Sequence, residues 1–127
     1  MDPEIESLIA DASLSAHLAT AVDGRPHVTP VWYDYHDGHL HVLTGGKKLG
    51  NVRRNSRVAV SIEQADGPDV EWSVSLLGTA EVVENPERVR EVSRRINAKY
   101  RGEDEAGDTS GGAVVDIAIG SATAQRY

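Results

Sequence analysis

The sequence predicts a mainly β fold of the α+β class, in which about six antiparallel strands close into a barrel with short flanking helices. Three observations support this prediction. Several short runs alternate apolar and polar side chains, as half-buried strands do. Asp-Gly pairs at 23–24 and 37–38 separate such runs and are typical of tight hairpins. The chain shows no strand–helix–strand rhythm, which argues against a doubly wound parallel sheet.

The first elements follow from local signals. Asp2, Pro3 and Glu4 are typical of a helix start, and we expect this helix to end near Ala12. Strands are expected at residues 17–22, 27–35 and 39–43, joined by the two Asp-Gly turns. Because Pro30 has no backbone N–H to donate, strand 27–35 should be an edge strand or should carry a bulge.

The second half of the chain predicts two more helices and three more strands. The expected elements are a short helix at 49–55, a strand at 57–63, an acidic loop at 65–69, a strand at 70–83, a helix from 86 to about 100 and a last strand at 113–119. Gly78 should break the strand at 70–83, in a bend of the kind that curls a sheet into a barrel.

Composition narrows the function classes. The 127 residues suit one domain, 1–127. The absence of cysteine excludes disulfides and thiolate chemistry. A net charge of −7 argues against nucleic-acid binding, and no apolar run approaches the ~20 residues of a membrane span. The acidic N-terminus lacks the basic start of a secretory signal, so we expect a cytoplasmic protein. The acidic, lysine-poor balance further suggests a salt-adapted, halophilic cytosol.

One short stretch collects what an anionic ligand needs. It is Thr44-Gly45-Gly46-Lys47-Lys48, and it holds two of the three lysines of the chain. Two glycines let the backbone approach a ligand closely, and the hydroxyl and ammonium groups are donors. The amides that open the following helix add to them. We interpret this corner as a phosphate site beside strand 27–35, although an ordinary polar turn with solvated lysines would have the same spacing.

Three stretches together resemble a known family. They are DGRPHVTPVW from residue 23, HVLTGGKKLGNVRRNSRVAVSI from residue 41 and LLGTAEVVEN from residue 76. This pattern resembles the pyridoxamine 5′-phosphate oxidase-like flavin-binding split barrels, over residues 16–83 and weakly in the last strand. The resemblance implies a six-stranded antiparallel split barrel and a homodimer that binds FMN, or a deazaflavin, across its interface. Since the C-terminal segment lacks an obvious tryptophan-plus-arginine substrate signature, the chain is more similar to the uncharacterised branch than to the oxidase itself.

The resemblance also implies roles for individual residues. Lys48 would hold the flavin phosphate, with Lys47 as a second contact. The backbone of residues 30–32 would lie against the isoalloxazine edge, and residues 72–73 would reach the flavin of the partner subunit. The full set assigned to the cofactor is Pro30, Val31, Trp32, Thr44, Lys47, Lys48, Asn51, Trp72 and Ser73.

These assignments indicate a flavin-dependent oxidoreductase that moves hydride to or from a small substrate that the sequence does not name. No side chain stands out as the catalytic acid or base, and His27 is the nearest titrating candidate. Two alternatives stay open. The chain could bind flavin, or another phosphorylated ligand, without catalysis. It could instead be a metal- or haem-handling barrel that uses its histidines, since His39 and His41 would share one face of a strand near His36.

Overall fold

The computed structural model describes residues 1–45, 47–107 and 112–127, apart from the side chains of Lys47 and Lys48. The described residues form one antiparallel sheet of seven strands in the order β2-β1-β5-β6-β7-β4-β3. The strands are β1 (Ala16–Val22), β2 (Arg25–Val31), β3 (Tyr33–His36), β4 (His39–Thr44), β5 (Arg57–Asp66), β6 (Asp69–Val83) and β7 (Ala113–Arg126). The helices are α1 (Pro3–Asp11), α2 (Lys47–Arg54) and α3 (Pro86–Arg101).

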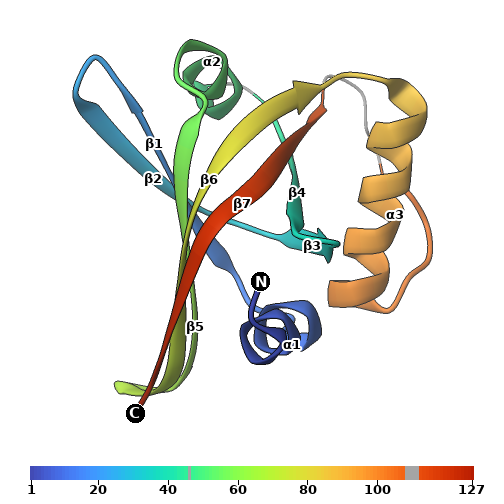
Figure 1. Cartoon of the computed structure of the whole chain (residues 1–127). Coiled ribbons are helices and arrows are strands. Elements are labelled where there is room, and N and C mark those ends of the chain that lie inside the picture. The colour runs from blue at the N-terminus through green and yellow to red at the C-terminus, as the bar shows by residue number, and fades with distance from the viewer. Residues whose placement is uncertain (46, 108–111) are drawn as a thin grey trace.

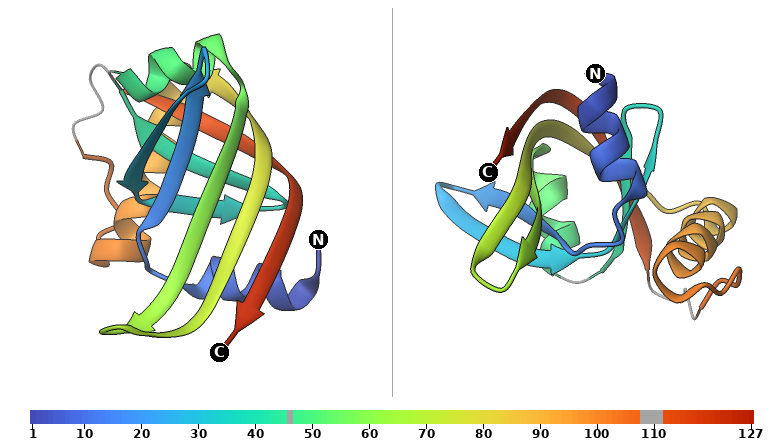
Figure 2. Two further views of the ribbon diagram at one scale, coloured as in Figure 1. Left: turned by 90° about the vertical axis from the view of Figure 1, so that its left-hand side faces the viewer. Right: turned by 90° about the horizontal axis from the view of Figure 1, so that it is seen from below.

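The sheet curls around an apolar interior, with α1 and α2 at opposite ends and α3 on the outside (Figures 1 and 2). This confirms the expected antiparallel barrel with short flanking helices. The interior is filled by inward-facing residues of the strands, such as Leu18, Ile62 and Leu76. A second, smaller cluster under α3 joins Val89, Val92 and Ile96 to Val114 of β7. None of the helices that the structure describes is long and apolar enough to cross a membrane.

The expected single strand at 27–35 is wrong, and this difference raises the number of strands from six to seven. The chain forms β2 up to Val31, leaves the sheet at Trp32 and begins β3 at Tyr33. β2 and β3 are the two edges of the sheet, so the chain crosses from one edge to the other at a single residue. The prediction that Pro30 lies in an edge strand is confirmed, because its only paired neighbour is β1.

The hairpins follow the expected turn chemistry. Asp23 and Gly24 have φ of 51° and 76°, and Asp37 and Gly38 have φ of 47° and 80°. Two successive positive φ values are the signature of the tight turns that match strand twist. The acidic loop expected at 65–69 is instead a third tight hairpin, since β5 continues to Asp66 and β6 begins at Asp69.

Gly78 does not break its strand, contrary to the prediction. β6 runs through it, and the irregularity is a register shift against β7 between Leu77 and Gly78. A Cβ at Gly78 would lie 2.6 Å from the carbonyl oxygen of Ala118 and 2.8 Å from Cγ2 of Ile117. Glycine is therefore needed for the close approach of two backbones rather than for a chain break.

Replacing Gly78 by alanine should destabilise the protein by about 1–3 kcal/mol, because the added methyl group overlaps a backbone carbonyl that cannot move alone. Urea unfolding followed by far-UV circular dichroism measures the change. The matched control is Gly50→Ala in α2, where nothing lies within 4 Å of the new methyl group. This control should stabilise the helix by about 0.5–1 kcal/mol. Equal effects of the two variants would contradict the packing argument.

Candidate functional site

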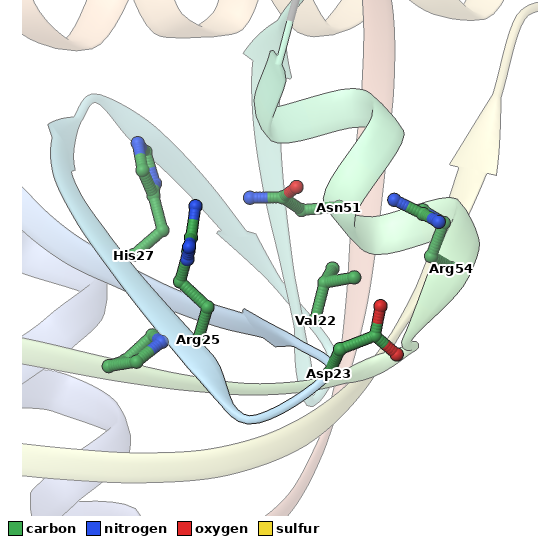
Figure 3. Close-up of a pocket in the computed structure, with 7 residues that line it drawn as sticks. Val22, Asp23, Arg25, His27, Asn51 and Arg54 are labelled. Carbon is green, nitrogen blue, oxygen red and sulfur yellow. The ribbon is translucent and has the colours of Figure 1, made fainter.

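A pocket of about 480 Å³ lies between the β1–β2 hairpin and α2, and we call it the hairpin pocket. Figure 3 shows its lining, which is Val22, Asp23, Arg25, Pro26, His27, Asn51 and Arg54. Arg25 rises from the hairpin, and Asn51 and Arg54 face it from the helix (Figure 3). Asp23 is the one acidic residue among the described lining residues, so cationic groups predominate.

Two asparagines hold α2 against the barrel and thereby fix the shape of this pocket. The side-chain amide of Asn51 donates to Oγ1 of Thr20 at 3.2 Å. The amide of Asn55 donates to the carbonyl of Ala21 at 2.9 Å. Between them, Val52 is buried in the core. The helix thus rests on β1 through one apolar and two polar contacts, and the wall that carries Arg54 is preorganised.

The glycine-lysine corner adjoins the same helix. Thr44 ends β4, where it pairs with Ala113 of β7. α2 begins at Lys47, two residues before the predicted start, so the helix opens directly at the corner. Residue 46 and the side chains of Lys47 and Lys48 lie outside the described part of the structure. The phosphate contacts assigned to the two lysines therefore stay predictions.

A second pocket of about 300 Å³ lies at the other end of β2, against α3, and we call it the α3 pocket. Residues 30–32, which were expected to contact the cofactor ring, form one side of this pocket, and residues of α3 form another. The full lining is Pro30, Val31, Trp32, Leu43, Ser93, Ile96, Asn97 and Arg101. The Trp32 ring is 38% exposed and stacks on Tyr100, with centroids 4.6 Å apart and planes 3° from parallel. The guanidinium carbon of Arg101 lies 5.2 Å from the centre of the Trp32 ring. β2 therefore connects a cationic pocket to an aromatic one.

Trp72 and Ser73 lie elsewhere. Both belong to β6, close to the β5–β6 hairpin, which is at the opposite end of the barrel from the β1–β2 hairpin (Figures 1 and 2). Trp72 is 8% exposed and lines a separate pocket of about 350 Å³ beside α1. Its register partner is Arg126, which forms an ion pair with Glu4. One chain alone does not bring these two residues to the pockets at the ends of β2.

Two of the histidines, His39 and His41, form contacts within the fold. Rings of His39 and His41 lie 6.3 Å apart on one face of β4, as predicted. His41 is buried, and its Nε2 accepts a hydrogen bond of 3.1 Å from Arg88 of α3. Nδ1 of His39 lies 2.7 Å from a carboxylate oxygen of Asp116. Within the ranges that the structure describes, no three histidine or acidic side chains are placed to hold a metal ion. This cluster instead attaches α3 to the sheet.

Comparison with known proteins decides the family. The family model described as pyridoxamine 5′-phosphate oxidase matches residues 2–126. The chain belongs to the pyridoxamine 5′-phosphate oxidase-like family. Among curated proteins, none matches the chain with significant similarity.

Solved structures have the same split-barrel fold. A conserved hypothetical protein of Mycobacterium tuberculosis, Rv2991, is 29% identical with a TM-score of 0.84, over 99% of this chain and 84% of its own. A structure titled F420 Reductase is 26% identical with a TM-score of 0.74, over 93% and 94% of the two chains. An FAD-binding protein of Mesorhizobium loti is 22% identical with a TM-score of 0.77, over 98% and 94%.

The residues assigned from the sequence account for only part of each pocket. Asn51 lines the hairpin pocket, and residues 30–32 line the α3 pocket. Arg54 was not assigned to the cofactor from the sequence, yet it lines the hairpin pocket with Arg25. Its spacing of three residues from Asn51 places both on one face of α2 and is the signal that could have found it. Tyr100 carries no motif, and only the docking of α3 brings it to Trp32.

Lys99 of α3 is half-buried against Tyr33, the first residue of β3. Its Nζ lies 3.7 Å from the centre of the Tyr33 ring and donates to the carbonyl of Tyr33 at 3.3 Å. Burial lowers the pKa of Lys99 from 10.5 to about 8, although the negative charges of Asp34 and Asp11 oppose the shift. Burial also favours a raised pKa of Asp34, but His41 and Arg95 outweigh it and lower this pKa.

The shifted Lys99 predicts that stability rises with pH between 8 and 10. In that window the unfolded chain keeps a proton on Lys99 that the folded chain releases, so the free energy of unfolding increases with pH. Above pH 10 the opposite effect begins, because burial raises the pKa of Tyr100 and unfolding lets it ionise. Urea titrations at several pH values should show the rise in the wild type and its loss in Lys99→Met. An equal slope in both proteins would contradict the assignment.

Proposed function

We propose that the chain is an oxidoreductase that binds a flavin-type cofactor, FMN or a deazaflavin, along β2. The observation that carries the proposal is the pair of pockets at the ends of this strand, one lined by arginines and one by Trp32. The cationic pocket adjoins the helix that opens at the glycine-lysine corner, in a chain whose net charge is −7. Membership of the family and 26% identity to the structure titled F420 Reductase support it.

The residues present fit such a cofactor. The amides that open α2, with Lys47 and Lys48, would hold the phosphate. The backbone of residues 30–32 would support the ring edge, and the stacked Trp32 and Tyr100 would limit how far the ring can slide. When bound, a flavin-type cofactor supplies hydride chemistry at its ring. The protein then has to orient the ring and leave one face open to the substrate.

The proposed active form is a homodimer. Within one chain, β1 and β5 separate β6 from β2, and Trp72 and Ser73 line neither pocket at the ends of β2. A second copy of the chain could bring them to a ring bound there. Large apolar side chains on the surface are consistent with such an interface, since Val28 is 65% exposed on β2 and Leu77 is 62% exposed on β6.

In high salt, where the repulsion between acidic surfaces is screened, the protein should be a dimer. Size-exclusion chromatography coupled to light scattering measures its mass. If the protein stays monomeric at every concentration tested in high salt, Trp72 and Ser73 do not contribute to the site.

Replacing Lys48 by alanine should raise the Kd for FMN or the deazaflavin at least tenfold, because a charge-assisted hydrogen bond contributes about 1.5–3 kcal/mol. Quenching of cofactor fluorescence measures Kd, and circular dichroism checks the fold. The control is Arg53→Ala on the same helix, where the exposed side chain pairs with Glu84 instead. Unchanged affinity in Lys48→Ala would place the phosphate elsewhere.

Reduction of the bound cofactor distinguishes an oxidoreductase from a protein that binds the cofactor without catalysis. An oxidoreductase should accept hydride from NAD(P)H onto its bound flavin or deazaflavin, so that the absorbance of the bound cofactor bleaches faster than that of the free cofactor. A pure carrier would bind with the same affinity and show no such acceleration.

A further inference from the structure

We propose that the α3 pocket binds the substrate, and that this substrate is a small planar organic anion such as an aromatic carboxylate. This rests on the proposed function, because it needs a cofactor ring whose edge lies on the backbone of residues 30–32. Those residues form one side of the α3 pocket, so a molecule in the pocket would lie beside the ring. The polar groups that would hold it belong to α3, and no residue of α3 was assigned to the site from the sequence.

The size of the α3 pocket suits a small ring. Its volume of about 300 Å³ is at the lower end of the range of about 300–1,000 Å³ that is typical of small-molecule sites. Trp32 and Tyr100 already stack with their centroids 4.6 Å apart, so no further ring can enter between them. A bicyclic ligand therefore has room in the pocket beside this stack, whereas a whole cofactor with its phosphate does not.

The lining of the α3 pocket is partly apolar and partly polar. Residues of β2 and β4, such as Val31 and Leu43, supply the apolar part. Ser93, Asn97 and Arg101 follow one another at intervals of four residues along α3, so they lie on one side of the helix. They add hydroxyl, amide and guanidinium groups to the lining. This combination suits a flat, mainly apolar molecule that carries a polar group at one end.

Arg101 gives the pocket a positive charge. It is the one charged residue among the described lining residues. Three other arginines of α3 each lie 3.4–3.8 Å from a carboxylate oxygen, as Arg95 does from Asp34. No such ion pair joins Arg101 to a carboxylate in the part of the chain that the structure describes. Because a guanidinium group binds a carboxylate through two parallel hydrogen bonds, an anionic ligand group suits this position.

The cation and the aromatic surface of the pocket are held next to each other. The guanidinium carbon of Arg101 lies 5.2 Å from the centre of the Trp32 ring, within the range of a cation–π contact. Trp32 stacks on Tyr100, whose hydroxyl donates to the carbonyl of Leu14 at 2.8 Å. The two groups are thus in place before a ligand binds, which lowers the entropic cost of binding. A planar anion would contact Trp32 with its ring and Arg101 with its carboxylate.

The test compares two bicyclic probes of the same shape, the anion 2-naphthoate and the neutral 2-naphthamide. Binding is followed through the indole N–H signal of Trp32 in heteronuclear NMR spectra. The chain has two tryptophans, and the loss of one signal in Trp32→Phe assigns it. Titrations use the protein alone and the protein saturated with FMN or a deazaflavin. In both forms the wild type should bind 2-naphthoate at least tenfold more tightly than 2-naphthamide, the effect of one charge-assisted contact.

Replacing Arg101 by glutamine should weaken the binding of 2-naphthoate about tenfold and change that of 2-naphthamide less than twofold. The matched control is Arg90→Gln, which removes the same charge from an exposed position of α3 outside the pocket and should leave both affinities unchanged. Circular dichroism with thermal unfolding verifies that each variant is folded.

The other outcomes decide against the proposal in different ways. Equal affinity of the wild type for the two probes, or equal effects of Arg101→Gln and Arg90→Gln, would overturn the choice of an anion. Competition between 2-naphthoate and the cofactor would assign the pocket to the cofactor ring, which overturns the proposal but leaves the proposed function intact. Binding of 2-naphthoate by a protein that binds neither FMN nor a deazaflavin would reject the proposed function, and the substrate role with it.

Discussion

The fold depends on how Tyr33 is buried at the point where the chain crosses from one edge of the sheet to the other. Its side chain is fully buried, and its hydroxyl donates to the carbonyl of Ile9 in α1 at 2.6 Å. Its backbone N–H donates to the hydroxyl of Tyr100 in α3 at 3.2 Å. A hydroxyl and a backbone N–H that leave water both need hydrogen-bond partners, and α1 supplies one and α3 the other, so both helices must dock for the crossing to be stable. Trp32, one residue earlier, is consequently directed out of the core and onto Tyr100.

This constraint shapes the candidate site, because it fixes one end of β2 while the Asp23-Gly24 turn fixes the other. α3 is held in position by apolar packing and by a polar cluster in which Arg88 contacts the buried His41. The shape of the α3 pocket is therefore set by contacts within the protein that would not themselves touch a ligand. The same reasoning explains why the histidines, which suggested metal binding in the sequence, have a structural use.

Local signals predicted most of the fold. Helix caps, Asp-Gly turns and alternating strands are set by neighbouring residues, and the placement of most elements was confirmed within a few residues. The last strand, expected at 113–119, instead runs on to Arg126. The break at Trp32 could not be predicted, because it depends on contacts of Tyr33 with helices far away in the sequence. The candidate site was predicted only where a motif exists. Arg25, Arg54 and Tyr100 join it through the packing of α2 and α3 on the barrel, which no local pattern encodes.

Several features that folding does not explain lie at the ends of β2. Elsewhere, many charged side chains pair with one another, and the core is apolar and closed. At the ends of β2 lie two arginines that form no ion pair with the described residues, a buried imidazole nitrogen that has no hydrogen-bond partner among them, and a tryptophan left partly in water. Each is unfavourable, or at best neutral, for the isolated chain. Sequences depart from such rules mainly at functional sites, and the proposed cofactor, which has an anionic group and a flat ring, would contact such groups.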